Sequence, residues 1–227
     1  MHPSSAETKS EGTPLKVWDL PTRLFHWTLV VFVVLSFITG ATGGTAMTTH
    51  QLSGEVILAL LLFRLAWGFV GGGTSRFGHF LRRPAEVLRY AAALIRGGTP
   101  RYFGHNPLGG WSIAVMLALL LVQAGTGLFA NDDIFIEGPL YDWVTKPTSD
   151  LLTRVHLFNR YLLLFVIGVH VAAVFFYLAV KRDNLILPML TGFKHWDADA
   201  VEPVREKALL ALVIALLSSA AVYLLVR

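Results

Sequence analysis

The chain has 227 residues, of which 54% are hydrophobic and only 15% are charged. A soluble domain carries about 25% charged residues, so this composition excludes an ordinary soluble protein and indicates one polytopic membrane domain. Cysteine is absent, which excludes disulfide bonds, cysteine-ligated clusters and haem attached through cysteine. The net charge of +4 does not indicate nucleic-acid binding, because the charges sort by loop.

Five apolar runs, each long enough to cross a bilayer as a helix, predict an all-α fold. We expect transmembrane helices over about residues 24–40, 52–70, 111–129, 157–180 and 208–226. The first four would form a four-helix bundle within a membrane domain at residues 17–182. Residues 1–16 are expected to be a disordered cytoplasmic tail, and residues 183–227 to be a cytoplasmic loop and the fifth helix.

The charges of the connections predict the orientation of the chain. Residues 41–51 contain no Lys or Arg, whereas residues 71–110 contain six arginines. Residues 130–155 are acidic, and the connection after the fourth helix is basic. Because Lys and Arg accumulate in cytoplasmic loops, we expect a bacterial inner-membrane protein with a cytoplasmic N-terminus and a periplasmic C-terminus. Within the second connection, residues 84–95 predict an amphipathic helix on the inner membrane surface.

The fourth apolar run contains two histidines, His156 and His170, separated by fourteen residues. On an α-helix this spacing is a rise of about 21 Å and a rotation about 40° short of four turns. The two imidazoles therefore share one face, near opposite sides of the hydrocarbon core. Polar groups at such depths are costly and usually functional.

The predicted topology sorts four histidines into two levels. Two lie near the inner surface and two near the outer surface: His26 with His170, and His50 with His156. Neutral imidazole is a good iron ligand, so each level predicts one non-covalent haem with two axial histidines. One intramembrane histidine alone could equally be a packing residue. Zinc is the competing metal, but it prefers four ligands at one point.

Other residues near these levels are candidates for contacts with the two haems. Arg23 and Arg160 share a helix face with His26 and His156, and Arg64 lies fourteen residues after His50. Each arginine is a candidate partner for a haem propionate, although Arg23 and Arg160 could instead extend to the membrane interface. Gly54 would leave space for a flat macrocycle, and Gly40, which shares the face of His26 at the outer level, is a further candidate contact. His105 remains open, as a residue of the inner haem edge, of a quinone pocket or of a turn.

Several of these segments together resemble the bacterial cytochrome b-561 family, which includes the b-type cytochrome subunit of nickel–iron hydrogenases. The similar segments are Arg-Leu-Phe-His-Trp at 23–27, His50 with Gly54, Gly-His-Asn-Pro-Leu-Gly at 104–109, Glu-Gly-Pro-Leu at 137–140, and the pair His156 and His170. The resemblance covers about residues 17–180. It implies a four-helix core with two b haems held by histidines of the first, second and fourth helices. The fifth helix departs from the family pattern.

We therefore expect an electron-transfer subunit of an oxidoreductase that moves electrons across the inner membrane. Quinone would be the membrane partner, and the acidic outer loop would dock a periplasmic c-type cytochrome or a hydrogenase-like dehydrogenase. One alternative is a superoxide-oxidising quinone reductase, for which Lys146, Arg154 and Arg160 would have to attract the anion. Another is a membrane protein that transports or handles haem.

Overall fold

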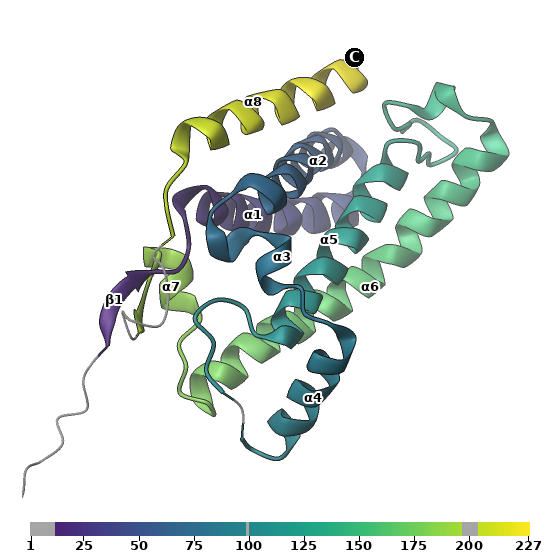
Figure 1. The fold of residues 1–227 in the computed structure, drawn as a ribbon. Helices are drawn as coiled ribbons and strands as arrows, with labels where there is room; N and C mark the ends of the chain where they lie inside the picture. The colour runs from purple at the N-terminus through teal and green to yellow at the C-terminus, as the bar shows by residue number, and fades with distance from the viewer. Residues whose placement is uncertain (1–11, 99, 197–203) are drawn as a thin grey trace, which may run out of the picture.

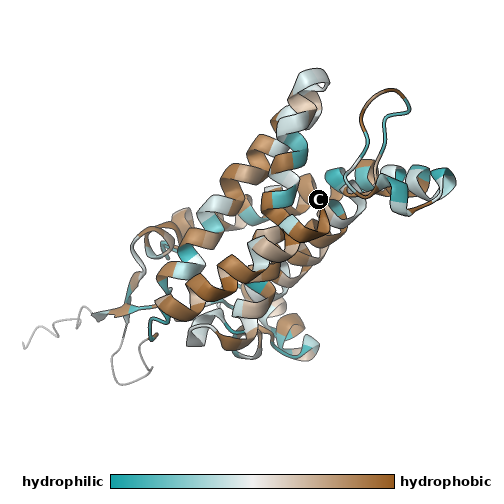
Figure 2. Ribbon diagram, turned by 90° about the horizontal axis from the view of Figure 1, so that it is seen from above, coloured by the Kyte–Doolittle hydropathy of each residue, from teal (hydrophilic) through white to brown (hydrophobic). Residues whose placement is uncertain are grey.

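The computed structural model describes residues 12–98, 100–196 and 204–227. Five of its helices are long and apolar enough to cross a membrane, as the sequence predicted (Figure 1). They are α1 (Leu20–Thr42), α2 (Met47–Val70), α5 (Pro107–Gly127), α6 (Lys146–Ala179) and α8 (Ala208–Leu225). Figure 2 shows hydrophobic residues along these helices and hydrophilic residues mainly in the connections.

Shorter elements occupy the connections. The helices are α3 (Phe77–Phe80), α4 (Pro84–Ile95) and α7 (Ile186–Thr191), and the 3-10 turns are η1 (Gly44–Ala46), η2 (Gly73–Ser75) and η3 (Tyr141–Trp143). Strands β1 (Thr13–Lys16) and β2 (Phe193–Trp196) form one antiparallel ribbon. β1 replaces the last four residues of the expected disordered tail, because its partner lies in a distant connection that sequence periodicity does not link to it. Residues 1–11 of that tail lie outside the described residues.

Helix α2 is at the centre of the bundle. It packs against α1, α5 and α8, and α5 packs in turn against α6. Leu61 and Trp67 of α2 are fully buried, and Phe25 of α1 and Leu163 of α6 belong to the same hydrophobic core. The apolar stripe of α2 therefore supplies the surface on which the other membrane helices assemble.

The N-terminus of α1 is fixed to the far end of α2 by a buried carboxylate. Asp19 caps α1 by accepting a hydrogen bond from the backbone N–H of Thr22, and Pro21 occupies the first turn. The other Asp19 oxygen accepts from Trp67 Nε1 at 3.3 Å and from the N–H of Gly72 at 3.2 Å. This cap explains why α1 begins at Leu20, four residues before the expected start of the first apolar run.

The largest difference in helix length concerns α6. It has 34 residues and is about 51 Å long, so it begins eleven residues before the expected start at residue 157. The added turns carry Asp150 and Arg154, whose charges keep them out of an apolar run but do not prevent a helix. They are fixed by Lys146, which pairs with Asp150 one turn later and with Asp133 in the preceding loop.

Helix α8 packs on α2 through Val222 and Val226, which contact Leu58. In Figure 1 it lies on the side of α2 away from α6. It thus adds a fifth candidate span outside the four helices that carry or support the histidines.

Five spans require the two ends of the chain to lie on opposite sides of the membrane. An alkaline phosphatase reporter, active only outside the cytoplasm, should therefore be active when fused after Arg227. The same reporter inserted after Arg96 should be inactive, because that loop is rich in arginine. An inactive Arg227 fusion that is stably expressed would contradict five spans with the N-terminus inside.

Candidate functional site

His50 of α2 and His156 of α6 face each other at the end of the bundle that carries the acidic loop. Their ring centroids are 6.1 Å apart and their planes are nearly perpendicular, at 86°. Two metal–nitrogen bonds of about 2.0–2.1 Å, with about 1 Å from each ring nitrogen to its centroid, span roughly 6 Å. The separation of the two rings therefore matches two imidazoles on opposite sides of one metal ion.

The tautomers of both rings are set by backbone carbonyls. Nδ1–H of His50 donates to the carbonyl oxygen of Ser36, and Nδ1–H of His156 donates to that of Gln123, each at 2.9 Å. With the proton on Nδ1, each neutral ring keeps the lone pair of Nε2 for a metal. This is the hydrogen-bonding arrangement that axial histidines require.

Gln123 also contacts the coordinating nitrogen of His156. Its Nε2 donates to Nε2 of His156 at 3.0 Å, while its Oε1 accepts from Asn159 at 2.7 Å. A metal ion at His156 would have to displace this amide, whereas the Nδ1 contact would remain. The sequence analysis did not connect Gln123 and Asn159 with the site. The only signal was that both are polar residues inside apolar runs.

Glycines border both rings. A Cβ atom at Gly40 would lie 3.0 Å from the ring of His50, and one at Gly127 would lie 3.0 Å from the ring of His156. Gly40, expected to be near the outer haem, leaves room for the ring of His50. Gly54 was expected to leave space for the macrocycle, and it has no other atom within 4 Å of a built Cβ, so it borders open space.

A second group of polar residues gathers at the opposite end of the bundle. His26 of α1 and His170 of α6 both belong to this end of the bundle, and the buried Nδ1 of His26 has no hydrogen-bond partner among the described residues. His105, just before α5, is enclosed by Trp18 and Phe80, with ring centroids 4.5 and 5.1 Å away. The structure therefore adds His105 to the two histidines expected at this level.

Burial, and then the charge of nearby Arg64, lowers the pKa of His105 to about 3. The ring is therefore neutral at physiological pH. Its Nδ1 is buried and has no partner among the described residues. His105 is thus a buried polar group whose hydrogen-bonding capacity the protein alone leaves unused.

Arg64 is the most deeply buried charged side chain of α2, at 3% exposure. Its guanidinium lies over the rings of Phe77 and Phe80, and one terminal nitrogen donates to the carbonyl oxygen of Ser75 at 3.1 Å. The other terminal nitrogen, NH1, is buried without a partner among the described residues. Because an unpaired buried donor is costly, this atom is available to a hydrogen-bond acceptor of a bound group near His105.

The other two candidate arginines differ. NH1 of Arg23 donates to the carbonyl oxygen of Leu190 and ties α1 to α7, while its Nε is buried and unpaired in the described part of the chain. Arg160 is half-buried, and it bonds to the hydroxyl of its neighbour Tyr161 at 2.8 Å. Arg23 therefore uses one nitrogen in a structural hydrogen bond and keeps its Nε for another group. Arg160 instead donates to a residue of its own helix.

The described residues contain no cluster of three or more His, Asp or Glu side chains that could hold a metal ion. Zinc therefore lacks its usual ligand set here. The rings of His50 and His156 instead fit a b-type haem. They face each other, each Nδ1–H donates to a backbone carbonyl, and the space beside Gly54 is open. The unpaired Nδ1 atoms of His26 and His105 and the unpaired NH1 donor of Arg64 are candidate contacts for a second such group.

Comparisons with known proteins bear on this site. A family model described as prokaryotic cytochrome b561 matches residues 17–192. A probable Ni/Fe-hydrogenase B-type cytochrome subunit of Azotobacter vinelandii is 30% identical, over 85% of this chain and 93% of its own length. The protein of the same description from Rhizobium leguminosarum bv. viciae is 25% identical, over 82% and 91%. No solved structure gives a significant match.

The two histidine levels predict two separable haems. A pyridine haemochrome assay should give two haems per chain for the wild type. His170→Ala should lose the inner component of the absorption spectrum and His50→Ala the outer one, because each removes one axial ligand. A wild-type ratio near one, or loss of the same component in His26→Ala and His50→Ala, would contradict the assigned pairs.

Arg64 should raise the potential of the inner haem, because a nearby positive charge favours the reduced state. Arg64→Leu should lower that potential by roughly 40–90 mV, equivalent to about 1–2 kcal/mol for one electron, and leave the outer potential nearly unchanged. Arg64→Lys should have a smaller effect because the charge is kept. The measurement is a redox titration in membranes, and an unchanged inner potential at normal haem content would exclude this role.

Proposed function

The chain belongs to the prokaryotic cytochrome b561 family, and on that premise we propose that it carries electrons across the inner membrane between the quinone pool and a periplasmic redox protein. It is a multi-pass membrane protein of a family that binds b-type haem. The observation that carries the proposal is the pair His50 and His156, whose geometry suits two axial ligands. The second pair, His26 and His170, would hold the inner haem.

Helix α6 supplies one ligand to each proposed site. His156 and His170 are about 21 Å apart along its axis, so one rigid element sets the distance between the two groups. A haem with two axial histidines supplies one-electron transfer when bound. The remaining ligands, His50 and His26, come from α2 and α1, which pack closely against each other.

The acidic loop after α5 is our candidate docking surface for the outer partner. Three backbone N–H groups, of Ile136, Ile134 and Phe135, donate to Oδ1 of Asp132 at 2.8–3.0 Å. The bonds from Ile136 and Ile134 lower the pKa of Asp132, so its carboxylate stays ionised at neutral pH. The turn exposes Phe135 at 91%, which places an aromatic side chain next to the negative charge.

The same loop is attached to the outer histidine site. Nε2 of Gln51 donates to the carbonyl oxygen of Glu137 at 2.7 Å, and Gln51 directly follows His50. A partner with a basic surface around an apolar pocket would therefore lie close to the outer haem. The relatives are described as hydrogenase cytochrome subunits, so a hydrogenase is one candidate partner and a c-type cytochrome is the other.

Superoxide oxidation is less well supported. Attraction of the anion would need free positive charge near the outer haem. Of the three candidate cations, Lys146 is paired with Asp133 and Asp150, and Arg160 donates to Tyr161, which leaves Arg154. The loop also carries several carboxylates. These contacts favour a protein partner over a small anion.

Exchange of electrons with quinone is directly measurable. The purified protein, reduced under anaerobic conditions, should be reoxidised on mixing with excess ubiquinone or menaquinone analogue, as followed by stopped-flow absorption of the haems. Buffer without quinone is the control. Failure of both quinones to reoxidise a protein with full haem content would overturn quinone as the membrane partner.

A further inference from the structure

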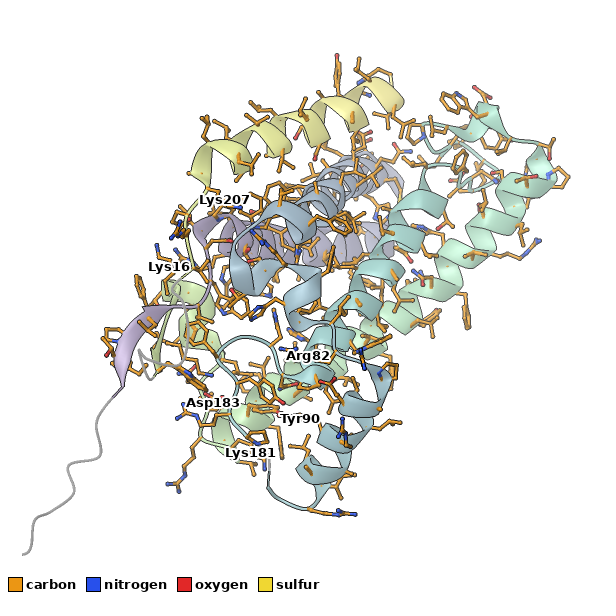
Figure 3. The ribbon with its side chains drawn as sticks, in the orientation of Figure 1. Lys16, Arg82, Tyr90, Lys181, Asp183 and Lys207 are labelled. Atoms are coloured by element: carbon orange, nitrogen blue, oxygen red, sulfur yellow. The ribbon has the colours of Figure 1, made fainter. Side chains whose placement is uncertain are left out.

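A polar cavity at the C-terminal end of α6 takes no part in the proposed electron transfer. It has a volume of about 70 Å³ and is partly open to solvent, between α4, residues 100–106 and the chain that follows α6. Figure 3 shows Tyr90, Lys181 and Asp183 gathered here. Arg101, Asn106 and Tyr177 also line it.

The cavity has an excess of positive charge. Asp183 is buried, and its carboxylate contacts Lys194 at 3.1 Å and Arg101 at 3.5 Å. Lys194 does not line the cavity, but Lys181 does, so two cations, Arg101 and Lys181, face one carboxylate that Lys194 already pairs. The side chain of Arg101 is 65% exposed, and most of its N–H donors are left for another acceptor. This balance selects an anion.

Hydrogen-bond donors in the cavity are only partly used. Nζ of Lys181 donates to the carbonyl oxygen of Gly97 at 3.2 Å, which leaves two of its three N–H groups. The hydroxyls of Tyr90 and Tyr177 are 2.7 Å apart, and Nδ2 of Asn106 donates to Tyr177 at 3.0 Å. One phenolic proton joins the two tyrosines, and the other has no acceptor among the described residues. An acceptor with several oxygens would satisfy these groups together.

Exposed apolar side chains lie close in the sequence to Lys181 and to its hydrogen-bond partner Gly97. Val180, 64% exposed, precedes Lys181, and Ile95, 88% exposed, lies two residues before Gly97. Leu88 of α4 is two turns before Ile95 on the same side and is also exposed. A free phosphate ion would leave these side chains in water, whereas a lipid would cover them with its acyl chains.

We propose that this cavity binds the phosphate of an anionic phospholipid, with the acyl chains against Ile95 and Val180. The charge excess and the unused donors would recognise the headgroup, and the apolar flank would recognise the tails. Bound lipid would join α4 to the end of α6. The site depends on the membrane location of the chain and not on the proposed redox function.

The test compares lipids on the purified, haem-containing protein. Phosphatidylglycerol in mixed micelles should raise the thermal unfolding midpoint more than phosphatidylcholine at equal concentration. Lys181→Gln should bind phosphatidylglycerol about fivefold more weakly, as expected for one lysine near an anionic lipid. Lys181→Arg should retain most of the affinity because it keeps the charge.

Lys207→Gln is the matched control. Lys207 also donates to a backbone carbonyl, that of Val70 at 2.7 Å, but it does not line the cavity. This variant should keep wild-type lipid affinity, and all variants should keep the wild-type haem spectrum.

Three results would overturn the proposal. They are equal stabilisation by the two lipids, wild-type affinity in Lys181→Gln, and an equal shift with inorganic phosphate alone, which would identify a free-anion site. If the Lys181 variants do not fold, native mass spectrometry of the wild type decides. Retention of phosphatidylglycerol over phosphatidylcholine supports the site, and equal retention excludes it.

Discussion

A buried carboxylate holds the inner end of the bundle together. Asp19 is fully buried, and its oxygens accept hydrogen bonds from the caps and loops of two helices, through Thr22, Trp67, Gly72 and Ser75. A hydrogen bond to a charged group contributes about 1.5–3 kcal/mol, so these bonds together fix their members strongly. A Cβ at Gly72 would lie 2.4 Å from the carboxylate, which means that only glycine fits there.

The position of the inner site depends on this carboxylate. Asp19 sets the first turn of α1, and His26 follows two turns later on that helix. Ser75 links Asp19 to Arg64, because its hydroxyl donates to the carboxylate while its carbonyl accepts from the guanidinium. The candidate ligand His26 and the buried Arg64 therefore occupy fixed positions relative to each other before any cofactor is considered.

Hydrophobic run length predicted the five membrane helices, because crossing a bilayer imposes a minimum length that composition alone reveals. It did not predict the β1–β2 ribbon, whose strands are far apart in sequence, or the outer turns of α6, whose charges hide a continuing helix. Helical spacing indicated which histidines share a face. It gave no signal for the carbonyls of Ser36 and Gln123, because backbone acceptors leave no trace in residue type.

The ribbon between β1 and β2 also constrains the order in which the protein is made. Thr13 pairs with Trp196, so the segment before the first membrane helix gains its partner only after most of the chain has left the ribosome. His26 likewise has no His170 beside it until α6 has been synthesised. During synthesis the N-terminal helices therefore enter the bilayer before their partners exist, and the ribbon can close only after residue 196 has emerged.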